Sequence, residues 1–402
     1  MNLSDNQKDA IDKLSKYKVG ALFMEQGTGK TRTAIELVNS TDCDYVLYIA
    51  PYRVIYPESS TSIKEEVEKW GGFNTEVDYL GVESLSNSDR LYLKYLNKLN
   101  KYKKPFVLVD ESIKIKNNES KRSQRVLHLG EHSEYRLILN GTPITRDLLD
   151  LWSQMQFLHP KILDMGLNQF KNTFCKTKTV TKRVGNKTNS KEFITGYANI
   201  DYLHSLISEF VYHCDIRLNI DRLNHKINYK LCNESRERYN ELKEYFLSNE
   251  MLDFRNNNIF IEMTQAMQHS YSSTKDKIDV VSKLLKEIGC ENTIIFYKYV
   301  SSGEKLKKKF PKCLVLSFQK SSLGLNLQKY NNTIYFDKVW DYYLMEQSKS
   351  RTYRVGQENT CNYYHLTGNV GLDRLIDINI DKKISMAEYL KYKTMKEIKE
   401  EL

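Results

Sequence analysis

Residues 19–39 read VGALFMEQGTGKTRTAIELVN, an apolar run followed by a glycine-rich turn and a helical pattern. The run Val19–Met24 has the length of a buried β-strand, and Thr31–Asn39 repeats apolar residues at helical spacing. A strand that passes through a tight turn into a helix is the unit from which parallel sheets covered on both faces are built. The segment therefore predicts an α/β fold whose ligand loops lie at the carboxyl ends of the strands.

The same alternation of strands and helices extends over residues 1–160, which we predict to form a first lobe. Its other expected elements are the strands Tyr45–Ala50, Phe106–Val109 and Arg136–Leu139 and the helices Ile63–Trp70 and Asp147–Leu158. The pattern returns over residues 275–402, which we predict to form a second α/β lobe. There we expect the helices Lys277–Ile288, Gly303–Phe310 and Leu344–Arg351 and the strands Thr293–Tyr297, Leu314–Ser317, Thr333–Phe336 and Asn362–Leu366, the last of which closes the sheet.

Residues 161–274 lack this alternation, and we interpret them as an insertion between the lobes. The segment Lys171–Lys191 has seven basic residues and no acidic one. Its Val184-Gly185-Asn186-Lys187 is typical of a hairpin turn. Helical patterns follow at Tyr202–Phe210 and Glu234–Phe246. At the end of the chain, Lys382–Leu402 predicts a charged amphipathic helix packed on the second lobe.

The composition limits the partners and the compartment. The chain has 402 residues and a formal net charge of +10, which suits a polyanion such as nucleic acid, although a Lys-rich protein without such a partner has the same charge. The sequence has no long apolar run, so we expect no membrane span, and the polar N-terminus does not resemble a secretory signal. The seven cysteines form no CxxC pair, so we expect no zinc site and a reducing cytoplasm. We also expect a monomer.

The glycine-rich turn predicts a phosphate-binding site. Gly27, Thr28 and Gly29 allow the backbone to wrap around phosphates, and the following helix presents free N–H groups to the anion. We expect Lys30 to reach the β- and γ-phosphates and Thr31 to ligate Mg²⁺. Met24 stands where the strict phosphate-loop spacing has a glycine, so this is a variant. The alternative is a glycine-rich turn without a ligand.

Three further segments carry candidate chemistry. Asp110 and Glu111 end an apolar strand, where Asp110 could hold Mg²⁺ and Glu111 could polarise the attacking water. Gly141-Thr142-Pro143 is a small polar turn that could sense the nucleotide state. Arg351 and Arg354, three residues apart on one predicted helical face, could stabilise charge on the γ-phosphate. The alternatives are a strand that ends in solvated acids, an ordinary turn and a solvated basic helix.

Together and in this order, these segments resemble superfamily-two helicases, and most closely their Swi/Snf-type ATPase branch. The resemblance covers roughly residues 3–370 and rests on the following segments. They are Glu25–Thr31, Asp110-Glu111-Ser112-Ile113-Lys114-Ile115-Lys116-Asn117, Gly141-Thr142-Pro143 with Leu151-Trp152 and Phe157-Leu158-His159-Pro160, Gly324-Leu325-Asn326-Leu327, Asp337-Lys338-Val339-Trp340 and Gln347–Gln357.

The resemblance implies two RecA-like α/β lobes that bind Mg²⁺ and ATP. The first lobe would supply Lys30, Thr31, Asp110 and Glu111, and the second Arg351 and Arg354. Gln7 resembles the glutamine on the adenine side, and Gly324 and Gln347 lie in motifs at the nucleotide. For DNA, the resemblance and the basic segment imply contacts from Pro51, Arg53, Lys176, Lys178, Lys182, Arg183, Lys187 and Trp340, the last with a core tryptophan as the alternative.

The chain departs from the family pattern at several positions. Ile113 replaces the usual His of the acidic box, Asn140 replaces a Thr, and Phe318 stands where a Thr would touch the nucleic-acid backbone. Ser321 and Ser322 replace a pair of glycines. None of these changes removes a phosphate or metal ligand. They are typical of a small, divergent member, such as those carried by bacteriophages or other mobile elements.

The resemblance implies an ATP-driven translocase that moves along duplex DNA without separating the strands. The first alternative is a strand-separating helicase of replication or recombination, which shares every ATPase residue and could use the basic hairpin to part the strands. A second is a phosphate-loop kinase or metabolic ATPase, which leaves the second lobe unexplained. A third is an inactive DNA-binding scaffold, which the retained phosphate and metal ligands disfavour.

Overall fold

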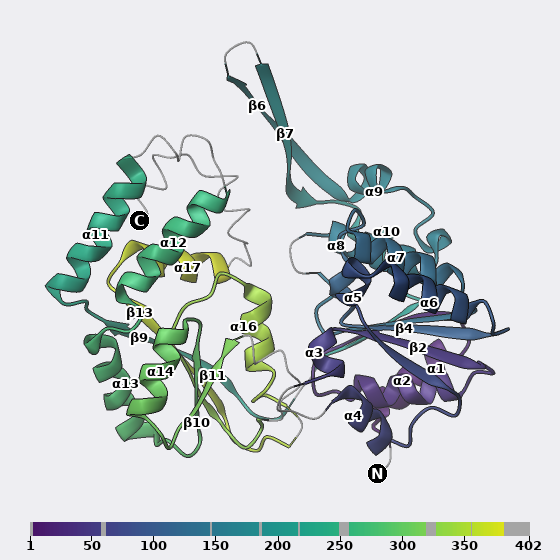
Figure 1. The fold of residues 1–402 in the computed structure, drawn as a ribbon, viewed down its shortest axis with the longest axis horizontal. Helices are drawn as coiled ribbons and strands as arrows, with labels where there is room; N and C mark the ends of the chain where they lie inside the picture. Colours follow the sequence, from purple (N-terminus) through teal and green to yellow (C-terminus); the bar gives the residue numbers. More distant parts are fainter. Residues whose placement is uncertain are drawn as a thin grey trace. The chain divides into compact units, whose positions relative to one another are not determined.

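A computed structural model describes residues 3–57, 62–144, 147–184, 187–215, 218–248, 257–318, 327–354 and 356–381 of the chain. These residues form two compact units, Met1–Arg217 and Leu218–Leu402. Each unit is built around one parallel β-sheet with helices beside it (Figure 1). The predicted α/β class is therefore confirmed.

The first unit has a six-stranded parallel sheet in the order β3-β2-β4-β5-β1-β8. Its strands are β1 (Val19–Met24), β2 (Tyr45–Ala50), β3 (Val77–Gly81), β4 (Pro105–Asp110), β5 (Tyr135–Asn140) and β8 (Val211–Cys214). Because all strands run in the same direction, the segments that follow β1, β2, β4 and β5 meet at one edge of the sheet, the edge formed by the carboxyl ends of the strands. The candidate phosphate loop, the acidic pair and the Gly-Thr-Pro turn all follow strands at this edge.

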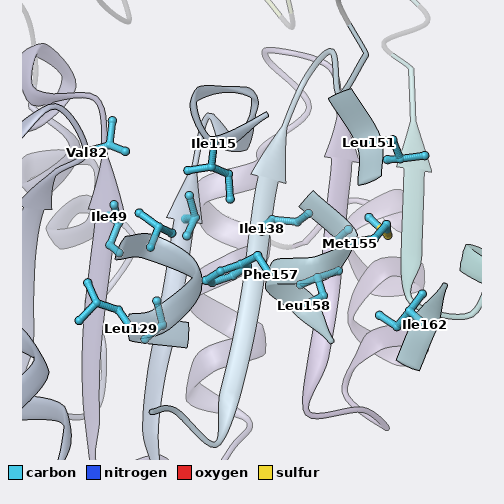
Figure 2. Close-up of a cluster of buried hydrophobic side chains, with 14 of the residues drawn as sticks. Ile49, Val82, Ile115, Leu129, Ile138, Leu151, Met155, Phe157, Leu158 and Ile162 are labelled. Atoms are coloured by element: carbon cyan, nitrogen blue, oxygen red, sulfur yellow. The ribbon is translucent and has the colours of Figure 1, made fainter. Parts of the chain in front are cut away.

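Helices cover both faces of this sheet, as continuous apolar strands require. Along β2, Tyr45, Leu47 and Ile49 belong to one core, and Val46, Tyr48 and Ala50 belong to the other. The Val46 face packs against α1 (Asp5–Leu14), α2 (Lys30–Asn39), α3 (Tyr52–Ile55) and α4 (Ile63–Lys69). The opposite face packs against α5 (Ser84–Asn87), α6 (Asp89–Leu99), α7 (Lys121–Glu131), α8 (Leu149–Leu158), α9 (Leu167–Phe174) and α10 (Ile200–Ile207). Figure 2 shows Met155, Phe157 and Leu158 of α8 against Ile138 of the sheet.

The basic segment forms the predicted hairpin. Strands β6 (Cys175–Val184) and β7 (Lys187–Tyr197) pair in antiparallel register, with an irregularity between Lys176 and Thr177. The ribbon extends from α9 and the start of α10, away from the sheet of the first unit (Figure 1). The turn residues Gly185 and Asn186 lie outside the described residues.

The second unit has a five-stranded parallel sheet in the order β11-β10-β12-β13-β9. Its strands are β9 (Arg222–Tyr229), β10 (Thr293–Tyr297), β11 (Leu314–Ser317), β12 (Asn332–Tyr335) and β13 (Cys361–Gly368). Its helices are α11 (Asn233–Ser248), α12 (Asn257–Tyr271), α13 (Lys275–Ile288), α14 (Val300–Lys309), α16 (Tyr342–Lys349) and α17 (Gly371–Asp381). One core joins residues from these strands and from the helices around them.

Two expectations about the organisation of the chain were wrong. The strand expected at Asn362–Leu366 does not close the second sheet, because β9 pairs with β13 on its outer side. Residues 161–274 do not form an insertion of their own. The boundary between the two units falls between residues 217 and 218. Before it the chain forms β8, the outermost strand of the first sheet, and after it β9, the outermost strand of the second. The helix expected at Lys382–Leu402 lies outside the described residues.

Within the described part of the chain, none of the helices combines the length and the apolar character that a membrane crossing requires.

Candidate active site

The candidate phosphate loop joins β1 to α2. Two of its residues, Gly27 and Gly29, have left-handed backbones with φ of 92° and 86°, a conformation that favours glycine. Thr28 donates its hydroxyl to the carbonyl of Glu25 at 2.7 Å, which closes the turn. Because Gly29 is the N-cap of α2, the free N–H groups of the first helical turn begin directly after the loop. The backbone can therefore bind an anion here.

Gln7 contacts this loop from α1. Its Oε1 accepts a hydrogen bond from the N–H of Ser4 at 2.9 Å, and its Nε2 donates to the carbonyl of Gly29 at 3.2 Å. A β-carbon at Gly29 would lie only 2.3 Å from this Nε2. Gly29 therefore has two reasons to be glycine, its backbone conformation and the space that the Gln7 amide occupies. The contact between Gln7 and the adenine remains a prediction.

The acidic pair lies at the end of β4. In the sheet, β5 separates β4 from β1, the strand that leads into the phosphate loop. Lys30 donates its ammonium to the carbonyl of Met24 at 2.7 Å. A β-carbon on Gly141, after β5, would lie 3.6 Å from the same ammonium. Asp110 is the last residue of β4, which pairs directly with β5. The structure thus brings the loop, Asp110 and the Gly-Thr-Pro turn to the carboxyl ends of β1, β4 and β5.

Asp110 is held in place by hydrogen bonds on both carboxylate oxygens. Tyr48 donates its hydroxyl to Oδ2 at 3.2 Å, and the N–H of Glu111 donates to Oδ1 at 2.8 Å. Burial and then the charge of Glu111 raise the pKa of Asp110, against the opposite effect of Lys30. Mg²⁺ prefers oxygen ligands, so the Asp110 carboxylate and the Thr31 hydroxyl fit such an ion and could hold it.

Glu111 has an unusual backbone. Its φ of 52° and ψ of 52° place a non-glycine residue in the left-handed region, at a cost of about 1–2 kcal/mol. Strained residues of this kind cluster at functional sites, where the surrounding structure holds them. The conformation directs the chain away from β4 into the short 3-10 helix Ser112–Ile115.

A buried glutamine that the sequence analysis missed connects the acidic segment to the Gly-Thr-Pro turn. The Oε1 of Gln154, on α8, accepts hydrogen bonds from the Ser112 hydroxyl at 2.7 Å and from the Asn140 amide at 3.4 Å. Its Nε2 donates to the carbonyl of Pro143 at 2.7 Å. Asn140 in turn accepts from the N–H of Thr142 at 3.1 Å. The sequence of α8 gives no signal for this residue, because the helix has two glutamines and also contains Asp150 and Ser153.

Two departures from the family pattern are core residues. Ile113, in place of the usual His, is buried in the first unit. Phe318, in place of a Thr, is buried in the second unit, where its ring stacks on Phe296 and Tyr335 with centroids 5.5 and 5.7 Å apart. Both side chains contribute apolar packing where the family has a polar group.

The candidate arginines of the second unit do not lie on the predicted helix. Helix α16 ends at Lys349, and Arg351 and Arg354 lie in the turns that follow it, so the expectation of one helical face was wrong. Arg351 is buried and Arg354 is half-buried. Gln347 is a buried residue of α16, and Gly324 lies outside the described residues. The roles of these residues toward a nucleotide remain predictions.

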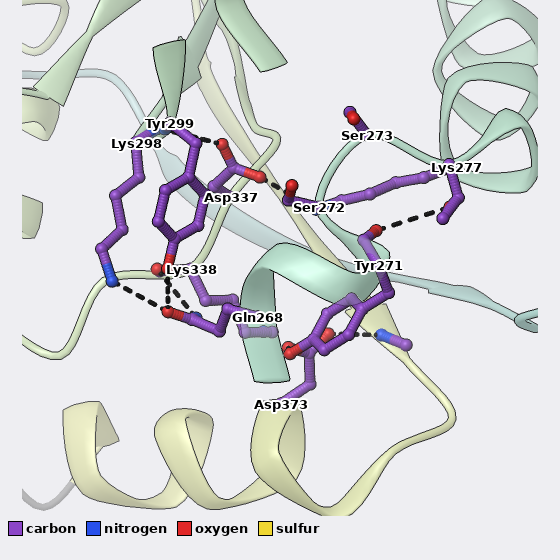
Figure 3. Close-up of polar contacts among 12 residues, drawn as sticks. Gln268, Tyr271, Ser272, Ser273, Lys277, Lys298, Tyr299, Asp337, Lys338 and Asp373 are labelled. Carbon is purple, nitrogen blue, oxygen red and sulfur yellow. Dashed lines mark hydrogen bonds and ion pairs between the residues drawn. The ribbon is translucent and has the colours of Figure 1, made fainter. Parts of the chain in front are cut away.

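Asp337 joins the segments that follow β10 and β12 in the second unit (Figure 3). Its Oδ1 pairs with the Lys277 ammonium at 3.1 Å, and both side chains are almost fully buried. Its Oδ2 accepts from the N–H groups of Lys298 and Tyr299 at 3.0 and 3.3 Å. The side chains of Lys298 and Tyr299 then share Gln268 Oε1 as acceptor, at 2.8 and 2.7 Å. Burial lowers the pKa of Lys298 to about 8.

The candidate DNA-binding residues differ in exposure. Pro51 is the N-cap of α3 and is half-buried, and Arg53 on the same short helix is exposed. Trp340 is only 7% exposed and packs in the second core, so the alternative of a core tryptophan is the one observed. Lys176 and Lys178 are exposed on β6. The side chains of Lys182, Arg183 and Lys187 lie outside the described part of the hairpin.

Comparison with known proteins identifies the family. The model of the SNF2-related domain matches residues 27–308, more than half of the chain. The chain is 23% identical to the transcription regulatory protein SNF2 of Saccharomyces cerevisiae, over 95% of this chain and 27% of that protein. It is 24% identical to the human chromodomain-helicase-DNA-binding protein 1, over 85% of this chain and 24% of that protein. It therefore spans about a quarter of the length of these curated relatives.

Among solved structures, the chain is similar to the Sulfolobus solfataricus SWI2/SNF2 ATPase core in complex with dsDNA. The sequence identity is 20% and the TM-score is 0.44, over 100% of this chain and 95% of that chain. The family match, together with the two parallel sheets and the phosphate-loop geometry, supports one assignment. The chain belongs to the SNF2-related domain family, and each of its two units is an α/β unit with one parallel sheet.

Proposed function

We propose that the protein is a DNA-stimulated ATPase that moves along duplex DNA as a monomer in the cytoplasm. The observation that carries the ATPase part is the placement of Lys30, Asp110 and the Gly141 turn at the carboxyl ends of the neighbouring strands β1, β4 and β5, with the Lys30 ammonium beside Gly141. The net charge of +10 supports a polyanionic track.

In this proposal the first unit binds the nucleotide. The loop amides and Lys30 bind the phosphates of ATP, and Gln7 contacts the adenine. Thr31 and Asp110 would hold Mg²⁺, which neutralises charge on the phosphate oxygens when it is bound. Glu111, beside Asp110, orients and polarises the water that attacks the γ-phosphate.

The second unit completes the reaction in this proposal. Arg351 and Arg354 stabilise the negative charge that develops on the phosphate oxygens, since a guanidinium is planar and always charged. Of the two, Arg354 is the more exposed. Gln347 and Gly324 belong to the same two family motifs and would contact the nucleotide.

DNA contacts are proposed at two places on the first unit. Pro51 and Arg53 follow β2 at the edge of the sheet that also carries the acidic pair. Lys176 and Lys178 are exposed on the projecting hairpin and would bind the phosphate backbone. We also propose that Lys182, Arg183 and Lys187 of the hairpin contact DNA.

The experiment that tests this function measures the ATPase rate without nucleic acid, with single-stranded DNA, with duplex DNA and with RNA. We expect duplex DNA to give the highest rate, and we expect the stimulation to fall as salt rises because binding to the backbone releases counterions. Equal turnover under all four conditions would favour a metabolic ATPase and contradict the proposal.

The projecting hairpin keeps one alternative open, a helicase that separates strands. In that case β6 and β7 act as a pin between the strands and not as a clamp on the backbone. A strand-displacement assay on a tailed duplex distinguishes the two functions. Release of the displaced strand that requires ATP and an intact hairpin would favour the helicase.

A further inference from the structure

Two tyrosines of α3 form an exposed aromatic pair at the edge of the sheet where the candidate active site lies. The side chains of Tyr52 and Tyr56 are 50% and 47% exposed. Their ring centroids are 5.0 Å apart, with an angle of 43° between the rings. Single exposed apolar residues are common on protein surfaces. Two large exposed rings in contact with each other are more typical of a binding site.

The ring of Tyr52 packs on one side against the end of the sheet. A β-carbon at Gly81, the last residue of β3, would lie 2.9 Å from its ring and 3.2 Å from its Cβ, so the ring lies directly over this glycine. The N–H of Tyr52 also donates to the Glu83 carboxylate at 2.8 Å. One side of the ring is thus packed on the end of the sheet, and its exposed part is preorganised for a ligand.

One basic side chain lies over the Tyr56 ring, and another is exposed on the same short helix. The Lys64 ammonium lies 4.5 Å from the centroid of the Tyr56 ring and 5.5 Å from that of Tyr79. Arg53, between the two tyrosines in sequence, is exposed. Aromatic rings next to exposed cations are the arrangement that binds a nucleic-acid base by stacking and the adjacent phosphate by charge.

The position of the pair connects it to the hydrolytic residues. Strand β2 carries Tyr48, which donates to Asp110, and the same strand continues through Pro51 into α3. In the sheet β2 is the direct neighbour of β4, which ends at Asp110. A ligand on α3 therefore lies one strand away from the acidic pair.

We infer that Tyr52 and Tyr56 form a stacking platform for an unpaired base of DNA, with Arg53 and Lys64 toward the flanking phosphates. This inference rests on the proposed DNA contact of α3. In an intact duplex the faces of the bases are covered by their neighbours, so an aromatic ring outside the helix meets only sugar and phosphate. A platform of this kind therefore favours DNA with an unpaired nucleotide, such as a single strand or the end of a tailed duplex.

The test compares equilibrium binding of the full chain to a fluorescent single-stranded oligonucleotide and to a blunt duplex. We expect Tyr52→Leu to weaken single-strand binding about tenfold, since one base stacked on an aromatic ring is worth about 1–3 kcal/mol, and Tyr56→Leu to act in the same direction. Binding to the blunt duplex should not change. Tyr52→Phe should keep the wild-type affinity, because it keeps the ring. Tyr245→Leu, at an exposed tyrosine of α11, is the matched control and should have no effect.

Three outcomes separate this inference from the proposed function. If the wild-type protein binds neither DNA, the proposed DNA track is wrong, and the inference falls with it. If the wild type binds DNA but Tyr52→Leu and Tyr56→Leu bind the single strand as tightly as the wild type, only the platform is overturned. An equal loss on single-stranded and blunt duplex DNA also overturns it, because the tyrosines would then contact the backbone or support the fold of α3.

Discussion

Replacing Gly29 by alanine tests the packing of Gln7 against the phosphate loop. The φ of 86° places the alanine in the left-handed region, which costs about 1–2 kcal/mol. The new β-carbon would also lie 2.3 Å from Gln7 Nε2, so the amide would have to move and lose its hydrogen bond to the Gly29 carbonyl, which costs about 0.5–1.5 kcal/mol. We therefore expect the first unit to lose about 1.5–3.5 kcal/mol of unfolding free energy and to bind ATP more weakly.

Gly71→Ala separates the two contributions. Gly71 is in the same unit and has a φ of 98°, but nothing lies within 4 Å of its added β-carbon. It should therefore lose only the backbone contribution, about 1–2 kcal/mol. In a Gln7→Ala background, where the overlap is gone, Gly29→Ala should cost no more than Gly71→Ala. Urea unfolding and binding of a fluorescent ATP analogue measure both effects. Equal losses for Gly29→Ala and Gly71→Ala in the wild-type background would refute the reasoning.

Three further substitutions test other parts of the site. Lys30→Ala should abolish hydrolysis while the urea midpoint stays near that of the wild type, and normal turnover in the folded variant would contradict the ATP site. Arg354→Ala should bind ATP with little change but hydrolyse it about 10³-fold more slowly in single-turnover assays with saturating DNA, and a wild-type rate would remove this arginine from the reaction. Asp337→Ala should lower the unfolding free energy of the second unit by about 3–5 kcal/mol, because it leaves the buried Lys277 ammonium without its carboxylate. A loss below about 1 kcal/mol in a urea titration, as for an exposed ion pair, would show that Lys277 finds water or another partner.

The central strands could be predicted from local pattern. The bounds expected for β1, β2, β10 and β11 agree with those observed, and β4 and β5 are each one residue longer at both ends. These strands are continuous apolar runs because helices cover both faces of each sheet. The phosphate loop and the acidic pair could be located for the same reason, since each follows directly on such a run.

The edge strands β8 and β9 could not be predicted in this way, although β11, which is also an edge strand, could. Most side chains of β9 are exposed or half-buried, so its sequence has no continuous apolar signal, and β8 has only four residues. Both strands lay in the segment that was interpreted as an insertion. Their membership in the sheets depends on pairing with β13 and β1, which are distant in the chain.

The side-chain partners of the site also depended on the tertiary structure. No local pattern indicates that Tyr48 bonds Asp110, that Gln154 joins Ser112 to Asn140, or that Trp340 is buried. A strand, a turn or a helix can be predicted from the spacing of its residues, because its conformation depends on interactions between residues close in sequence. Hydrogen bonds between elements and the burial of a single ring depend on which elements pack side by side, and that is decided only when the whole sheet and its helices assemble.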